Sequence, residues 1–138
     1  MNSEIISTRV FPVTRERLFT AFSDPRQLEL WWGPKGFTNT FEEFHFRPGG
    51  DWKFTMHGPD GKDYANQSVF AEIVKNELIV YDHTAPSFRM TITLADAEVG
   101  TRMTWCMGFP SAEICERFKS ICIPANEENF DRLATFLG

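Results

Sequence analysis

The chain has 138 residues, a length that fits a single domain over residues 1–138, and its net charge of −5 comes without a long run of either sign. Nucleic-acid grooves and polybasic membrane patches need clustered Lys and Arg, so the sequence predicts neither kind of partner. No stretch approaches the roughly 18 apolar residues of a membrane span, and residues 1–10 lack the apolar core of a secretion signal. We therefore expect a cytoplasmic protein without a membrane span.

The N-terminal quarter reads as one strand followed by two short helices. Residues 5–11 are rich in β-branched side chains, which favours a strand. Thr14 is placed as the N-cap of a helix over residues 15–23. Asp24, followed by a proline, is placed to cap a second short helix that ends before Gly33.

From residue 40 the hydrophobic period changes to two, which predicts six further strands. Short turns between successive strands are typical of an antiparallel meander. The predicted strands cover residues 40–50, 51–58, 64–74, 77–84, 88–96 and 101–109.

An apolar stripe at helical spacing over residues 112–137, with Ser111 as N-cap, predicts one helix roughly 40 Å long. Pro124 is expected to kink it, because proline removes a main-chain hydrogen bond. The order β-α-α-β6-α predicts an α+β fold, a seven-stranded antiparallel sheet wrapped around this helix. One helix about 10 Å wide does not cover seven strands spaced by about 4.8 Å, so we expect a hollow between sheet and helix.

Three segments carry a family resemblance: residues 21–25 (AFSDP), 31–34 (WWGP) and 46–52 (FRPGGDW). Their order and spacing resemble the SRPBCC (START/Bet v 1-like) superfamily, within it the AHSA1-like branch named for activators of Hsp90 ATPase. The resemblance implies a helix-grip (Bet v 1-like) fold with an apolar cavity between the sheet and the C-terminal helix. Members include hydrophobic-ligand binders, cyclases, dehydratases, lipid-transfer domains and co-chaperone domains.

The adjacent Trp31 and Trp32 precede a Gly-Pro turn, so they are not expected to point into one helical core together. We expect one indole to pack beneath the end of the long helix and the other to lie at the cavity rim with Phe37. Two interpretations stay open: both side chains seal the end of the domain, or one of them admits or stacks a ligand.

Aromatic and methionine side chains at alternate strand positions are expected to face the long helix, either as core packing or as a cavity lining. Thioethers fit irregular shapes and aromatic faces stack on ligands, which favours a small hydrophobic ligand as partner. The predicted ligand-binding residues are Trp31, Trp32, Phe37, Trp52, Phe54, Met56, Phe88, Met90, Trp105, Met107, Phe118 and Cys122.

Polar residues decide between a binder and an enzyme. Tyr64 and Glu72 share one face of the fourth predicted strand, and Asp82 lies on the next strand. An inward Glu72 would be a buried carboxylate able to serve as acid or base, as a cyclase or dehydratase requires. The opposite register buries Val69 and Ile73 and leaves Glu72 in water.

The sequence carries no motif for a cofactor, and its three histidines, His45, His57 and His83, lack the spacing of metal ligands. We therefore expect neither a cofactor nor a metal, and no catalytic motif stands out. The first hypothesis is a binder of a small hydrophobic or aromatic ligand. The alternatives are a cyclase-type enzyme and a co-chaperone-like interaction module, with a second copy of the chain as a further candidate partner.

Overall fold

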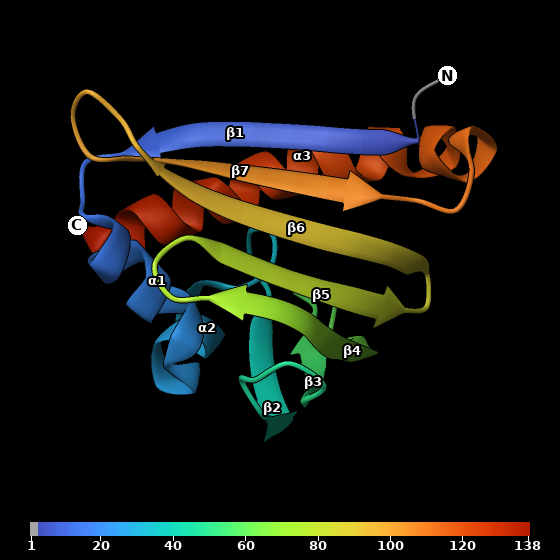
Figure 1. The fold of residues 1–138 in the computed structure, drawn as a ribbon. Coiled ribbons are helices and arrows are strands. Elements are labelled where there is room, and N and C mark those ends of the chain that lie inside the picture. Colours follow the sequence, from blue (N-terminus) through green and yellow to red (C-terminus); the bar gives the residue numbers. More distant parts are fainter. Residues whose placement is uncertain (1–2) are drawn as a thin grey trace.

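The computed structural model describes residues 3–138, which form a curved sheet wrapped around a long helix (Figure 1). The predicted α+β helix-grip architecture is confirmed, with antiparallel strands in the order β1-β7-β6-β5-β4-β3-β2. Helix α3 crosses the concave face, and α1 and α2 close one end (Figure 1). The elements are β1 (Glu4–Phe11), α1 (Arg15–Ser23), α2 (Pro25–Trp31), β2 (Thr38–Phe44), β3 (Asp51–His57), β4 (Asp63–Val74), β5 (Leu78–Thr84), β6 (Ser87–Asp96), β7 (Thr101–Gly108) and α3 (Ala112–Leu137).

All three predicted N-caps are confirmed. The side-chain oxygens of Thr14, Asp24 and Ser111 each accept a main-chain N–H from the first turn of their helix. Helix α3 continues past Pro124. The bend expected at that residue stays a prediction.

Strand β2 begins earlier and ends earlier than predicted. It stops at Phe44, and residues 45–50 form a turn in which the Gly50 N–H donates to the Arg47 carbonyl at 2.8 Å. A Cβ atom at position 50 would collide with the His45 carbonyl oxygen, so this turn requires glycine. The prediction missed the boundary because the aromatic alternation continues into the turn.

Strand β4 uses both of the alternative registers. Ser68 and Phe70 point inward and are buried, but the pairing shifts between Phe70 and Glu72 at a β-bulge. A bulge reverses the faces that follow it, so Ile73 is partly buried and Glu72 is exposed. The structure thus places the carboxylate of Glu72 in water.

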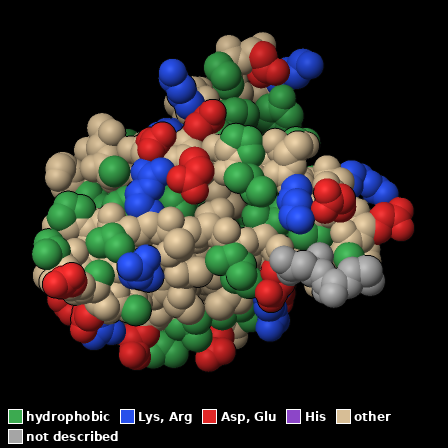
Figure 2. Space-filling model, turned by 90° about the horizontal axis from the view of Figure 1, so that it is seen from above, with side chains coloured by type: hydrophobic (Ala, Val, Ile, Leu, Met, Phe, Trp, Pro, Cys, Tyr) green, Lys and Arg blue, Asp and Glu red, His purple; other side chains and the backbone are tan. Residues whose placement is uncertain are grey.

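The surface shows no basic stripe on the face seen from above, where acidic and basic side chains are interspersed (Figure 2). Within residues 3–138, no helix is both long enough and apolar enough to cross a membrane.

Candidate functional site

The expected hollow is filled by Trp32, the residue that caps the C-terminal end of α2. Its ring centroid lies 5.1 Å from that of Trp52, 5.4 Å from Trp105 and 6.4 Å from Tyr81, and only 8% of the residue is exposed. The expectation that one of the two indoles lies at a rim with Phe37 is therefore wrong, because Trp31 is buried as well. It fails because α2 directs Trp32 toward the middle of the concave face.

A cavity of about 10 Å³ remains beside Trp32. That is about the space of one water molecule, whereas sites for small ligands have volumes of roughly 300–1,000 Å³. A ligand therefore fits this interior only when side chains move. The cavity is lined by Phe22, Leu28, Trp32, Phe46, Trp52, Phe70, Ile79, Tyr81 and Ile92.

Two buried polar atoms on β3 and β4, the first of them on a residue that lines this cavity, have no hydrogen-bond partner within the described residues. They are Nε1 of Trp52, a residue 2% exposed, and Oγ of Ser68, a residue 1% exposed. The two residues are direct cross-strand partners on the concave face. By contrast, the indole N–H groups of Trp31 and Trp105 donate to the Ala21 carbonyl and to the Met103 sulfur, at 3.1 and 3.2 Å.

Tyr81 also contributes a polar group to the cavity lining. Complete burial raises the pKa of its phenol far above the ordinary value, because the interior disfavours the phenolate. The side chain therefore stays neutral and keeps its O–H as a donor.

One guanidinium holds the end of α2 that carries Trp32. Nη1 of Arg132 donates to the carbonyls of Trp32, Gly33 and Pro34 at 3.0 to 3.1 Å, and Nη2 donates to that of Leu30 at 3.1 Å. The last carbonyls of a helix lack partners within it, and Arg132 supplies them. Partial burial lowers the pKa of Arg132.

Two asparagines complete this attachment. Nδ2 of Asn129 donates to the Trp31 carbonyl at 2.9 Å, and its Oδ1 accepts the Gly33 N–H at 3.1 Å. Asn39 on β2 donates to the Trp32 carbonyl at 2.9 Å. The main chain around Trp32 is thus fixed from both α3 and β2, whereas its indole makes ring contacts.

The predicted ligand-binding residues separate into two groups by burial. Those around Trp32 are buried. Of the partly buried ones, Phe37 and Met56 lie beside Gly33, and Phe88 and Phe118 lie at the other end of the concave face. At that open end, successive ring contacts join His83, Phe88, Phe109 and Phe118 at centroid distances of 4.8 to 5.7 Å. The buried residues are Trp31, Trp32, Trp52, Phe54, Met90, Trp105 and Met107, and the partly buried ones are Phe37, Met56, Phe88, Phe118 and Cys122.

The structure does not turn either candidate acid toward the interior. Glu72 is exposed beyond the bulge, and Asp82 binds Arg89 at 2.8 and 2.9 Å. These hydrogen bonds lower the pKa of Asp82, so it is a stable carboxylate. Tyr64 is 43% exposed and donates to Asp60 at 3.3 Å, with partial desolvation and the Asp60 charge raising its pKa.

A groove of about 380 Å³ lies outside the interior, between α2 and α3. Its lining mixes apolar Leu30 and Phe136 with side chains of both charges, and Arg132 forms part of it. Three of its charged side chains already hold partners within the fold: Asp131 accepts from Arg9, Glu128 accepts the main-chain N–H of Lys35, and Arg132 donates to the carbonyls at the end of α2.

Sequence reasoning missed Ser68, Tyr81 and Arg132. Ser68 could have been found, because a serine that points inward next to aromatic residues is visible in the sequence pattern. Arg132 could not, because an arginine in the last turns of α3 gives no such signal. Within the described part of the chain, no cluster of three or more His, Cys, Asp or Glu side chains could hold a metal ion.

Comparisons with known proteins agree with this architecture. The family model described as Activator of Hsp90 ATPase homolog 1-like protein matches residues 12–138. A solved structure from Chromobacterium violaceum is 28% identical, with a TM-score of 0.84 over 99% of this chain and 98% of that one. One from Nitrosomonas europaea has a TM-score of 0.89 at 19% identity, over 97% and 93%, a likeness of fold alone. A search of curated proteins finds no match.

Proposed function

The chain belongs to the Activator of Hsp90 ATPase homolog 1-like family of the SRPBCC superfamily, and on that premise we propose that it binds a small, neutral, mainly apolar ligand between sheet and α3. The observation that carries the proposal is the pair of buried, unpartnered polar atoms, Trp52 Nε1 and Ser68 Oγ. Leaving a buried donor or acceptor unpaired costs roughly 1–3 kcal/mol. A ligand that supplies the missing acceptor removes that cost.

The interior sets the chemistry of this ligand. Its buried polar residues are uncharged, so an ionised carboxylate or ammonium would be buried without a counter-charge, at a high cost. The indole of Trp52 donates only, and the hydroxyl of Ser68 can donate or accept. A flat apolar molecule with one neutral acceptor, such as an aryl ketone, satisfies both.

Entry of the ligand requires Trp32 to leave the centre of the concave face. Because Arg132 and Asn129 hold the main chain of this segment, we propose that the indole rotates while α2 stays in place. The partly buried rings of Phe88 and Phe118 at the open end then form the route. Trp32 would act as the gate of the site.

The test compares two ligands of nearly equal shape, 2-acetylnaphthalene and 2-ethylnaphthalene, by thermal shift and tryptophan emission. The ketone is expected to raise the melting temperature progressively with concentration, as binding to the native state requires. The hydrocarbon lacks the acceptor and is expected to bind at least about tenfold more weakly, the effect of roughly one hydrogen bond.

Equal shifts from both compounds would contradict the role of the polar pair while leaving an apolar site. No shift from either compound at its solubility limit, with unchanged emission, would contradict the proposed site.

A further inference from the structure

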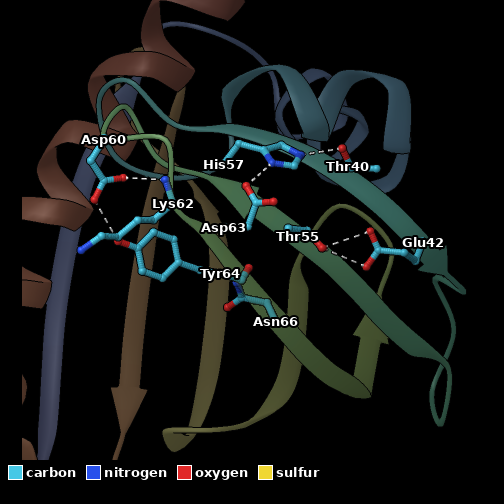
Figure 3. A network of polar contacts seen from close by, with 9 residues as sticks. All are labelled: Thr40, Glu42, Thr55, His57, Asp60, Lys62, Asp63, Tyr64 and Asn66. Atoms are coloured by element: carbon cyan, nitrogen blue, oxygen red, sulfur yellow. Dashed lines mark hydrogen bonds and ion pairs between the residues drawn. The ribbon is translucent and has the colours of Figure 1, made fainter.

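Three side chains from neighbouring strands form a hydrogen-bonded relay on the outer face of the sheet, away from the proposed ligand site (Figure 3). Nε2 of His57 lies 2.7 Å from Oγ1 of Thr40, and Nδ1 of the same ring lies 2.7 Å from Oδ1 of Asp63. His57 and Asp63 are direct cross-strand partners, and Thr40 lies diagonally across on β2. The order hydroxyl, imidazole, carboxylate is that of a nucleophilic triad.

The carboxylate determines where the protons lie. An ionised Asp63 only accepts, so the proton of this contact belongs to Nδ1 of His57. In the neutral ring Nε2 then has a free lone pair, and the Thr40 hydroxyl donates to it. This is the arrangement in which a histidine removes a proton from a hydroxyl during attack.

The hydroxyl is open to substrate. Thr40 is exposed, and the His57 side chain is 37% exposed. Strand β2 is an edge of the sheet, and edge strands present N–H groups that no neighbouring strand uses. Such groups are the type of donor that stabilises an oxyanion.

A groove of about 330 Å³ begins two residues along β2 from the relay. Glu42, Lys53 and Gln67 contribute to its lining on the same outer face. It offers space for the remainder of a substrate whose reactive carbon lies at Thr40.

We propose that Thr40, His57 and Asp63 form an acyl-accepting site for activated esters, such as aryl esters or thioesters. Oγ1 of Thr40 attacks the acyl carbon while Nε2 of His57 takes the hydroxyl proton. The bond to the leaving group breaks, and His57 returns the proton to it. Water then attacks the acyl-threonine ester with His57 as base, which releases the carboxylic acid and regenerates the Thr40 hydroxyl.

The chain provides a matched control in Thr55, a cross-strand partner of Thr40 on the same face. Its hydroxyl donates to the carboxylate of Glu42 at 3.3 to 3.4 Å and makes no contact with His57 (Figure 3). Thr55 therefore presents a threonine hydroxyl on the same face, half-buried where Thr40 is exposed, without the relay.

The experiment treats the full chain with p-nitrophenyl acetate, follows release of p-nitrophenolate, and maps acetylated peptides by mass spectrometry. The side-chain hydroxyl at position 40 is expected to be acetylated in the parent chain and in T40S. Acetylation of that position should fall at least about tenfold in H57Q and D63N, because general-base assistance contributes roughly 10²–10⁴-fold. T55V should match the parent.

The proposal is overturned if acetyl groups appear on lysines alone, or if T40V releases p-nitrophenolate as fast as the parent. It is also overturned if H57Q leaves the acetylation of Thr40 unchanged. Circular dichroism of each variant separates these results from loss of the fold.

Discussion

The two ends of the concave face are built from the same alternating strands, yet one end is sealed and the other is open. At the sealed end, Trp52 on β3 is 2% exposed beneath Trp32. At the open end, Phe88 on β6 and Phe118 on α3 are only partly buried. The difference lies in what is packed above the sheet: α2 supplies an indole at one end and supplies nothing at the other. The alternating hydrophobic pattern of a strand therefore does not tell whether its inward side chains are packed in the core or line a cavity.

The largest expected effect comes from removing the indole that seals the interior. Trp32→Ala should lower the free energy of unfolding by about 3–5 kcal/mol, since it leaves a cavity among rigid rings. Phe118→Ala, at the open end, should cost about half as much because the side chain is only partly buried. Urea denaturation measures both, and equal losses would remove the distinction between the two ends.

The next largest effect on the free energy of unfolding is expected from releasing the C-terminal end of α2. Arg132→Ala removes one donor from each of four main-chain carbonyls of this segment, of which those of Trp32 and Pro34 keep a second donor, and should lower the free energy of unfolding by about 2 kcal/mol. The control is Arg9→Ala, which removes ion pairs to exposed Glu127 and Asp131 and should cost less than about 1 kcal/mol. If Arg9→Ala proves the more damaging change, Arg132 does not fix the position of Trp32.

Two buried serines sharpen the comparison further. Ser68→Ala should leave the free energy of unfolding unchanged or raise it by up to about 1 kcal/mol, because the lost hydroxyl has no partner. Ser7→Ala should lower it by about 1 kcal/mol, because Ser7 Oγ accepts from Asn126 at 3.2 Å. The same Ser68 variant should bind 2-acetylnaphthalene more weakly. A clear loss of stability in Ser68→Ala would mean that its hydroxyl has a partner in solution.

The smallest effect concerns acid stability on the outer face. Arg89 lowers the pKa of Asp82 in the folded state below its value in the unfolded chain. The contribution of Asp82 to stability is therefore complete above the pKa that it has in the unfolded chain. It is lost as the pH falls through the pKa of Asp82 in the folded state. The pair is largely exposed, so the contribution should be under about 0.5 kcal/mol. Asp82→Asn should flatten the stability profile on the acid side of the ordinary aspartate pKa by that amount, and a steeper profile would contradict the assignment.

Most of the fold was predictable because its determinants are local. Helix caps, turn residues and the period-two hydrophobic pattern predicted seven strands and three helices. The motifs of the family predicted how these elements are arranged. The ends of β2 and the bulge in β4 were not predictable, since both depend on pairing with a neighbouring strand.

The site was predictable in composition but not in geometry. The sequence predicted that Trp52, Phe54 and Trp105 face the interior, where they are buried, but it did not name Phe70 or Tyr81 as part of the site. The central position of Trp32 depends on how α2 docks against α3. The relay through Thr40, His57 and Asp63 joins three strands at separations that no sequence motif contains. Its residues become neighbours only through the register of β2, β3 and β4.

The most direct test of the account is ¹⁹F NMR of the protein labelled with 5-fluorotryptophan, which gives one signal for each of its 4 tryptophans. Trp32→Phe assigns the signal of the gate, and the labelled protein is then titrated with 2-acetylnaphthalene. The account predicts that the Trp32 signal moves most and the Trp31 signal least, because only the Trp32 indole changes place. A saturable melting-temperature shift with the Trp32 signal unmoved would contradict the claim that this side chain closes the site.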